Sequence, residues 1–211
     1  MIELSLLRHG QTDFSRENRF CGSIDPPLNA VGLRMAAAFG ASWRAYPWTA
    51  IWCSPSTRAL QTADPLAQAL GRPVRTDEGL REIAYGEWES LRHDEVKATS
   101  PQAYAWWSAD PASRGTPGGE TAFHVAARAA PVLERIREAH ADGKVLVVSH
   151  KATIRVLMCT LLGLDVRLYR DRLSQPVASL SRFELGSSGA RLTMLGDVSH
   201  LPEDLRGIEG T

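Results

Sequence analysis

The chain has 211 residues, of which 44% are hydrophobic and 23% are charged, and its formal net charge at pH 7 is zero. This length and composition are typical of one globular domain with a substantial core. The absence of a basic excess argues against a nucleic-acid partner, although a neutral chain can still hold a strongly positive pocket.

The cysteines and the apolar segments exclude further classes of protein. Cys21, Cys53 and Cys159 are far apart and form no C-x-x-C pair, so we expect neither a disulfide framework nor a zinc site. No apolar run approaches the roughly 20 residues that cross a membrane, and the first residues lack the pattern of a secretory signal. We therefore expect a cytoplasmic protein with no membrane partner, in which Cys53 and Cys159 are buried.

Strand-like and helix-like segments alternate along the chain. Apolar and β-branched runs predict strands at residues 2–7, 49–53, 73–75 and 144–148. Periodic or alanine-rich segments predict helices at residues 30–46, 55–70, 121–141 and 152–162. Asn29 is the expected N-cap of the first helix, and Gly71 and Gly163 are expected to end the second and the fourth. A closing hairpin is predicted from residues 177–185 and 191–195.

This alternation predicts an α/β fold, a three-layer α/β/α sandwich with a mostly parallel central sheet. Residues 91–119 are the least regular segment, and we expect them to form one or two short helices and a loop. They are interpreted as a small cap-like insertion within a single domain spanning residues 1–211. Sheets of this kind bind ligands beyond the carboxyl ends of their strands, so the residues that follow strands are the candidate site.

Side chains suited to phosphate follow several of the predicted strands. Arg8 and His9 come after the first strand, and Arg58 lies in the first turn of the helix after the second. His150 follows the most strand-like segment of the chain, and Glu82 follows a short strand. Arginine forks and helix N-termini both bind phosphate oxygens, so the sequence predicts a pocket for a dianion at one edge of the sheet.

The same segments resemble the signature motifs of the histidine phosphatase superfamily, the phosphoglycerate mutase-like family, in its phosphatase branch. The motifs occur in the family's order and span residues 2 to about 163. They are Arg8 to Thr12 with Glu17 to Gly22 and Asp25, then Ser54 to Ala63, Leu80 to Ile83 with Tyr85 to Glu89, Pro117 to Glu120, and Val148 to His150. The resemblance implies the phosphoglycerate mutase-like version of the sandwich.

The resemblance also implies roles for individual residues. His9 would be the nucleophile that carries the phosphoryl group as a covalent intermediate. Arg8, Arg58 and His150 would bind the phosphoryl oxygens and stabilise the transition state. Glu82 would give a proton to the leaving oxygen and then take one from the hydrolytic water. Protein cations would supply the charge that a metal supplies elsewhere, so no metal or other cofactor is expected.

Further substrate contacts are implied around this centre by Ser15, Cys21, Gly22, Tyr85 and Lys151. Two segments here depart from the family pattern. Phe14 and Ser15 stand where many relatives have tryptophan and asparagine, and serine is a shorter donor. Lys151 stands where glycine is common. It is either a solvated start of a helix or a contact to a second acidic group on the substrate.

Three functions are compatible with these residues. The first is hydrolysis of a small phosphorylated metabolite, of the sugar phosphate or phosphoglycerate type. The second is a cofactor-dependent phosphoglycerate mutase, because residues 17–22 resemble mutases closely. Mutases, however, carry a paired-arginine insertion, whereas residues 91–119 offer only the isolated Arg92, Lys97 and Arg114. The third is a non-enzymatic phosphate-binding module, which the intact set of five central residues disfavours. We therefore predict a phosphatase; a homodimer is left open.

Overall fold

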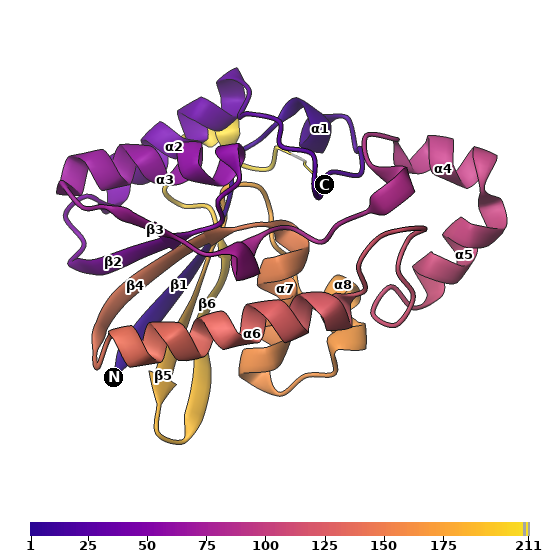
Figure 1. Ribbon diagram of the computed structural model, residues 1–211. Helices are drawn as coiled ribbons and strands as arrows, with labels where there is room; N and C mark the ends of the chain where they lie inside the picture. The colour runs from indigo at the N-terminus through magenta and orange to yellow at the C-terminus, as the bar shows by residue number, and fades with distance from the viewer. Residues whose placement is uncertain (209, 211) are drawn as a thin grey trace.

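The computed structural model describes residues 1–208 and 210, and its centre is one six-stranded sheet (Figure 1). The strand order is β3-β2-β4-β1-β5-β6. Pairs β1–β4, β2–β4 and β2–β3 are parallel, whereas β5 runs antiparallel to β1 and β6 antiparallel to β5. The strands are β1 (Ile2–Arg8), β2 (Trp48–Cys53), β3 (Val74–Thr76), β4 (Gly143–Ser149), β5 (Leu180–Gly186) and β6 (Gly189–Asp197).

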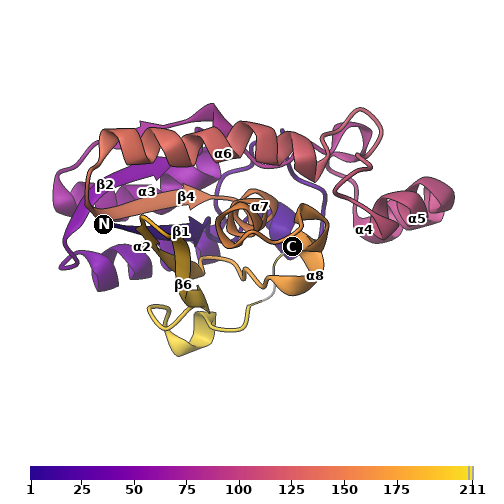
Figure 2. The ribbon, with the colours of Figure 1, turned by 90° about the horizontal axis from the view of Figure 1, so that it is seen from below.

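Helices cover both faces of this sheet. In Figures 1 and 2, α2 and α3 lie on one face, while α6 and α7 lie on the other. The helices are α1 (Asp13–Arg16), α2 (Ala30–Trp43), α3 (Thr57–Leu70), α4 (His93–Thr99), α5 (Pro101–Ala109), α6 (Ala122–Ala139), α7 (Lys151–Leu162) and α8 (Tyr169–Arg172). The predicted three-layer sandwich with a mostly parallel sheet is confirmed.

The two central strands supply both halves of the core. Successive side chains of a strand point to opposite faces. Leu4 and Leu6 of β1 therefore pack with α6 and α7, whereas Leu7 packs with α2 and α3. In β4, Val147 likewise packs with α6 and α7, whereas Val148 packs with α2 and α3. Arg8 and Ser149 are the last residues of β1 and β4, so both lie at the carboxyl ends of these paired strands.

Several predicted helix ends are confirmed and others shift by a few residues. The Asn29 side chain accepts a hydrogen bond from the Gly32 amide, and Gly71 and Gly163 adopt the left-handed conformation that ends α3 and α7. Helix α2 ends at Trp43 rather than near residue 46. Helix α3 begins at Thr57, two residues later than predicted, because Ser56 is its N-cap and Pro55 therefore precedes the helix. The closing hairpin is confirmed, although its first strand begins three residues later than predicted.

The segment 91–119 contains α4 and α5, the two short helices expected there, and projects from one end of the sheet (Figure 2). A separate aromatic cluster attaches it to the rest of the chain. Phe20, Trp88 and Trp107 are buried together, and the His93 ring stacks on Phe20 with centroids 3.9 Å apart. This cluster lies beside the carboxyl ends of the strands, so the segment forms one wall of the candidate site.

Cys53 and Cys159 are buried as predicted, Cys21 is partly exposed, and all three are free thiols. Within the part of the chain that the structure describes, no helix has both the length and the apolar character needed to cross a membrane.

Candidate active site

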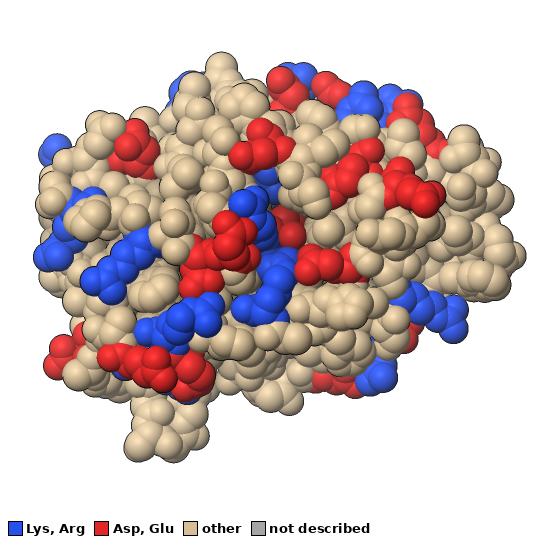
Figure 3. Space-filling model, viewed as in Figure 1, with Lys and Arg blue, Asp and Glu red and all other residues tan. Residues whose placement is uncertain are grey.

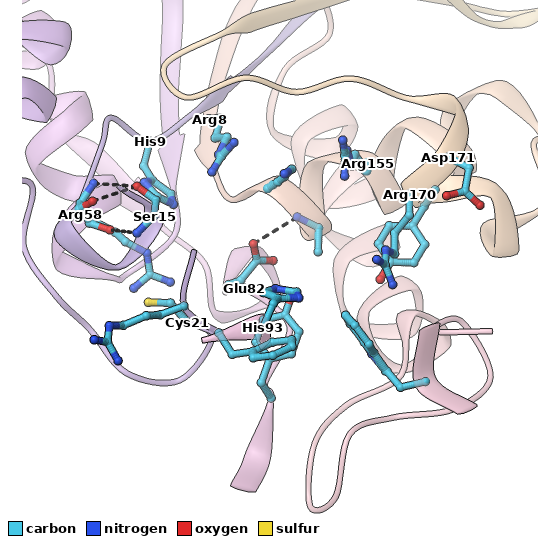
Figure 4. A pocket seen from close by; sticks show the side chains of 18 residues that line it. Arg8, His9, Ser15, Cys21, Arg58, Glu82, His93, Arg155, Arg170 and Asp171 are labelled. Carbon is cyan, nitrogen blue, oxygen red and sulfur yellow. Dashed lines mark hydrogen bonds between the residues drawn. The ribbon is translucent and has the colours of Figure 1, made fainter. Parts of the chain in front are cut away.

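A cavity of about 370 Å³ opens at the carboxyl ends of the parallel strands (Figure 4). It is lined by the end of β1, α1 and the loop after it, the start of α3, the loop after β3, helices α4 and α5, the first turns of α7, and α8. Its walls are formed by Arg8, His9, Thr12, Ser15, Arg19, Phe20, Cys21, Arg58, Glu82, Tyr85, His93, Trp107, Lys151, Ala152, Arg155, Tyr169, Arg170 and Asp171. Most of the predicted site residues are thus brought together.

His9 lies at the end of β1 with one ring nitrogen already engaged. Its Nδ1 is 2.7 Å from the Gly10 carbonyl oxygen, which can only accept, so Nδ1 carries the proton. The other nitrogen, Nε2, therefore holds the lone pair. Burial, reinforced by the positive charges of Arg58 and Arg8, holds the pKa of His9 well below its usual value. The imidazole is consequently neutral and nucleophilic at pH 7.

Two buried arginines flank His9 and are held by carbonyl oxygens. Arg8 Nη1 donates to the Gln175 carbonyl at 2.8 Å, and burial lowers the pKa of Arg8 to about 9. Arg58 Nη1 donates to the Ile24 carbonyl at 2.9 Å, and its Nη2 donates to the Gly22 carbonyl at 3.2 Å. Arg58 Nη1 also lies 3.4 Å from the Asp25 carboxylate, so carbonyl oxygens and one partly exposed carboxylate orient the two guanidinium groups for an anion.

His150 lies behind His9, at the N-cap of α7. The two rings meet edge-on with centroids 5.1 Å apart. Its Nε2 is 2.8 Å from the Ser54 hydroxyl, and its buried Nδ1 has no hydrogen-bond partner within residues 1–208 and 210. Burial, with the nearby charge of Arg58, holds the pKa of His150 well below its usual value. His150 thus contacts His9 as a neutral ring with one unused nitrogen, but it is fully buried and is not part of the cavity wall.

Glu82 enters the cavity from the loop that follows β3. Its Oε1 accepts hydrogen bonds from the Ile83 amide at 2.9 Å and the Thr153 amide at 3.1 Å. Its Oε2 accepts one from the Ala152 amide at 3.1 Å. Two of these donors belong to the first turn of α7, where backbone N–H groups have no partner within the helix. The free end of α7 thus fixes the carboxyl group close to the two histidines.

Arg128 of α6 holds the loop that carries Glu82. Its guanidinium donates to the carbonyl oxygens of Gly79 at 2.9 Å, Arg81 at 2.8 Å and Glu82 at 3.0 Å. It also forms a two-pronged ion pair with Glu120, whose Oε2 accepts from the Ala84 amide. Although partial burial opposes its ionisation, Glu120 has a lowered pKa because Arg128 donates to it. One side chain therefore fixes the path of the loop before and after Glu82.

The other predicted contacts differ in how they face the cavity. Ser15, Cys21, Tyr85 and Lys151 line it, whereas Gly22 lies behind Arg58 and is not part of its wall. The Ser15 hydroxyl donates to the Thr12 carbonyl and accepts from the Thr12 amide, closing the capping box of α1. Burial raises the pKa of Cys21 to about 11, so this thiol stays protonated.

Several lining residues were not anticipated from the sequence. Arg155, Tyr169, Arg170 and Asp171 come from α7 and α8, outside every motif. The only local signal was the spacing of Lys151 and Arg155, four residues apart and therefore on one helix face. His93, which also lies outside every motif, packs on the aromatic cluster and lines the cavity.

Basic and acidic side chains alternate on the surface of the molecule. On the face shown in Figure 3, basic side chains run through the middle and acidic ones flank them. Across the described ranges, 1–208 and 210, no group of three or more His, Cys, Asp or Glu side chains is placed to hold a metal ion.

Comparison with known proteins places this site in a family. The model of the histidine phosphatase superfamily (branch 1) matches residues 4–198. The bifunctional protein Rv2228c of Mycobacterium tuberculosis is 39% identical over 191 residues, 89% of this chain, and this chain spans about half (51%) of that relative. The glucosyl-3-phosphoglycerate phosphatase of Mycolicibacterium vanbaalenii is 35% identical over 171 residues, 77% of this chain and 75% of that protein.

Among solved structures, Bacillus stearothermophilus YhfR superposes with a TM-score of 0.89 at 30% identity, over 96% of this chain and 100% of that one. The family model and the superposition both cover nearly the whole chain. The chain belongs to the histidine phosphatase superfamily, branch 1.

Proposed function

We propose that the protein hydrolyses a phosphate monoester of a small metabolite, of the sugar phosphate or phosphoglycerate type, through a phosphohistidine on His9. The observation that carries the proposal is the hydrogen bond from His9 Nδ1 to the Gly10 carbonyl. It leaves Nε2 unprotonated in a cavity lined by Arg8 and Arg58. A neutral imidazole beside two guanidinium groups is the arrangement that nucleophilic attack on a phosphate dianion requires.

In the first step, Nε2 of His9 attacks phosphorus. The N–P bond forms as the bond from phosphorus to the ester oxygen breaks. Arg8 and Arg58 hold the equatorial oxygens, and the unused Nδ1 of His150 donates to the transferring group. Glu82 gives its proton to the departing oxygen, so an alcohol leaves and a carboxylate remains.

In the second step, a water molecule attacks the phosphohistidine. Glu82, now ionised, accepts a proton from this water as the new O–P bond forms and the N–P bond breaks. Inorganic phosphate leaves, and both His9 and Glu82 return to their starting protonation states. The backbone N–H groups of Ala152 and Thr153 keep the Glu82 carboxyl in one place for both transfers.

Two further observations support this proposal. One relative is named a glucosyl-3-phosphoglycerate phosphatase and another, the phosphoserine phosphatase 1 of Hydrogenobacter thermophilus, also carries a phosphatase name. The proposal needs no metal, because the described cavity holds enough cationic side chains to balance a phosphate dianion. The three free thiols fit a reducing compartment, so we propose a cytoplasmic location.

The experiment is to measure phosphate release from a panel of phosphorylated metabolites in the presence of EDTA, with isomerisation of 3-phosphoglycerate followed in parallel. The proposal predicts release that EDTA does not diminish. Isomerisation faster than release, dependent on added bisphosphoglycerate, would instead identify a mutase. Absence of both activities, with phosphate still bound, would favour a binding module.

A further inference from the structure

A second group of cations lines the cavity on the side away from His9. In Figure 4, Arg155 and Arg170 lie across the cavity from His9 and Arg58, with Glu82 between the two groups. Lys151 and Arg155 occupy one face of α7, four residues apart, and Arg170 comes from α8. Like charges at this spacing repel each other and destabilise a helix. Repulsion between Lys151 and Arg155 therefore lowers the stability of α7 when no anion is bound.

These three cations have no carboxylate partner. None of them forms an ion pair with any residue of 1–208 or 210, although sixteen of the seventeen ion pairs found there involve another arginine or lysine. Arg155 Nε and Arg170 Nη1 are buried without a hydrogen-bond acceptor among the described residues. The guanidinium carbon of Arg170 lies over the Trp107 ring, 4.4 Å from its centre. Both arginines are partly buried, and a buried guanidinium nitrogen without an acceptor is costly, so an anion is expected to complete them.

The charge balance of the whole cavity points the same way. Six cationic side chains and two carboxylates, Glu82 and Asp171, line it. Arg19 is paired with Glu17 and Arg58 with Asp25, both outside this set, which leaves Arg8 and the three cations of the second group. On the side of these three cations the only lining carboxylate is Asp171, and it forms no ion pair with any of them within residues 1–208 and 210. Positive charge therefore exceeds negative charge on the Lys151 side of the cavity.

We propose that Lys151, Arg155 and Arg170 form a second anion subsite, which selects phosphate esters whose leaving group carries another negative charge. The inference rests on the proposed function, because it concerns the leaving group of that reaction. The anion is a carboxylate or a second phosphate, and the shared chemistry is a group of oxygens that accepts hydrogen bonds from the guanidinium forks. Esters with a neutral leaving group leave the three cations unpaired and are poorer substrates.

The test uses two pairs of substrates that differ by one anionic group. One pair is 3-phosphoglycerate and glycerol 3-phosphate, and the other is fructose 1,6-bisphosphate and fructose 6-phosphate. The proposal predicts that kcat/KM for at least one charged member exceeds that of its neutral counterpart by about tenfold or more. The pair that shows the larger ratio tells whether the subsite takes a carboxylate or a phosphate.

Arg155→Met and Lys151→Met are expected to reduce this ratio about tenfold. Arg172→Met is the matched control, because Arg172 is exposed on α8 and is not part of the cavity wall; it should preserve the ratio. Circular dichroism and thermal melting check that each variant folds. Equal kcat/KM within both wild-type pairs, or an unchanged ratio in Arg155→Met, would overturn the subsite while leaving the phosphatase proposal intact. Failure to release phosphate from any ester would overturn the proposed function itself.

Discussion

His9 and His150 show how neighbours give one residue type two uses. A backbone carbonyl fixes the proton of His9 on Nδ1, which leaves Nε2 for attack. His150 uses the opposite nitrogen for the Ser54 hydroxyl and keeps its Nδ1 unengaged within the described chain. Both rings have a lowered pKa because they are buried beside arginine charge. At the scale of single residues, the site is an arrangement that keeps imidazoles neutral among cations.

The role of Glu82 can be tested through the leaving group. We predict that Glu82→Gln lowers kcat roughly 10²- to 10⁴-fold for alkyl phosphates, because an amide cannot protonate the departing oxygen. Nitrophenyl phosphate, whose leaving group needs no proton, should lose much less. Steady-state kinetics on both ester types provide the measurement. An equal loss on the two would show that Glu82 is not the acid.

The charge of Lys151 predicts a pH effect on selectivity. Burial, reinforced by the charges of Arg8 and Arg155, lowers the pKa of Lys151 to about 8, so its ammonium is charged below that pH and neutral above it. The other charged groups that act on it are Glu82 and Arg170. We therefore expect the preference for the doubly anionic substrate to decline as pH rises from 7 to 9. The ratio of kcat/KM values is the measurement, since it cancels effects on the shared phosphate.

Lys151→Met supplies the control for this pH effect. Its ratio should be low at every pH and should show no step near pH 8. If the step persists in that variant, another group, such as Arg8, is responsible.

Residues at strand ends could be predicted, whereas the far wall of the cavity could not. The sequence placed His9, Arg58 and Glu82 after strands, and the topology of a parallel sheet brings such positions to one edge. Arg155 and Arg170 join the same cavity because α8 folds back against α7, and no local pattern encodes that packing. The missed residues are those whose position depends on tertiary contacts alone.

At the scale of elements, the important segment is the loop that joins β3 to the segment before α4. Its middle carries Glu82, yet it contains only short 3-10 turns and no strand to stiffen it. Arg128 of α6 replaces that missing support through three carbonyl oxygens and through Glu120. We infer that Arg128 is a positioning residue, which acts on the reaction through Glu82.

Replacing Arg128 tests this positioning role. We expect Arg128→Met to lower kcat for alkyl phosphates more than for nitrophenyl phosphate, the same signature as Glu82→Gln, with a smaller change in KM. Arg137→Met is the matched control on the same helix, because Arg137 pairs at the surface with the nearby Glu134 and contacts no part of the loop that carries Glu82 among the described residues. A uniform loss on both ester types would indicate a general structural defect instead.

The elements themselves were predictable where their ends carry their own chemistry. Asn29 accepts the backbone hydrogen bond of an N-cap, and Gly71 and Gly163 take the left-handed conformation that favours glycine. No such residue marks the end of α2, so the sequence predicted a helix to residue 46 although α2 ends at Trp43. Helix α8, with four residues, is too short to produce a periodic pattern.

On the scale of the molecule, the central sheet and the projecting segment 91–119 contribute different parts of the site. The sheet positions the two histidines, while α4 and α5 attach through the aromatic cluster around Phe20 and Trp88 (Figures 1 and 2). Although the net charge is zero, six of the 24 Lys and Arg side chains line the cavity. Helix α7 joins the two functions, because its first turn holds Glu82 and its partly exposed face carries Lys151 and Arg155.

Two adjacent tryptophans test the contribution of the projecting wall. Trp107 is 4% exposed, packs in the cluster and supports Arg170, whereas Trp106 is 58% exposed. We predict that Trp107→Ala destabilises the protein by about 3–5 kcal/mol and raises KM, because it removes both core packing and cavity wall. Trp106→Ala should change stability by no more than about 0.5 kcal/mol. Thermal melting and steady-state kinetics are the measurements; equal effects of the two substitutions would contradict this division.

The central claim is that His9 carries the phosphoryl group, and trapping that intermediate tests it most directly. The protein would be mixed with a turned-over ester, quenched in alkali, digested and analysed by mass spectrometry. We predict one phosphoryl group on His9, stable in alkali and lost in acid, and its disappearance together with turnover in His9→Ala. A phosphoryl group on another residue, or normal turnover by His9→Ala, would contradict the account.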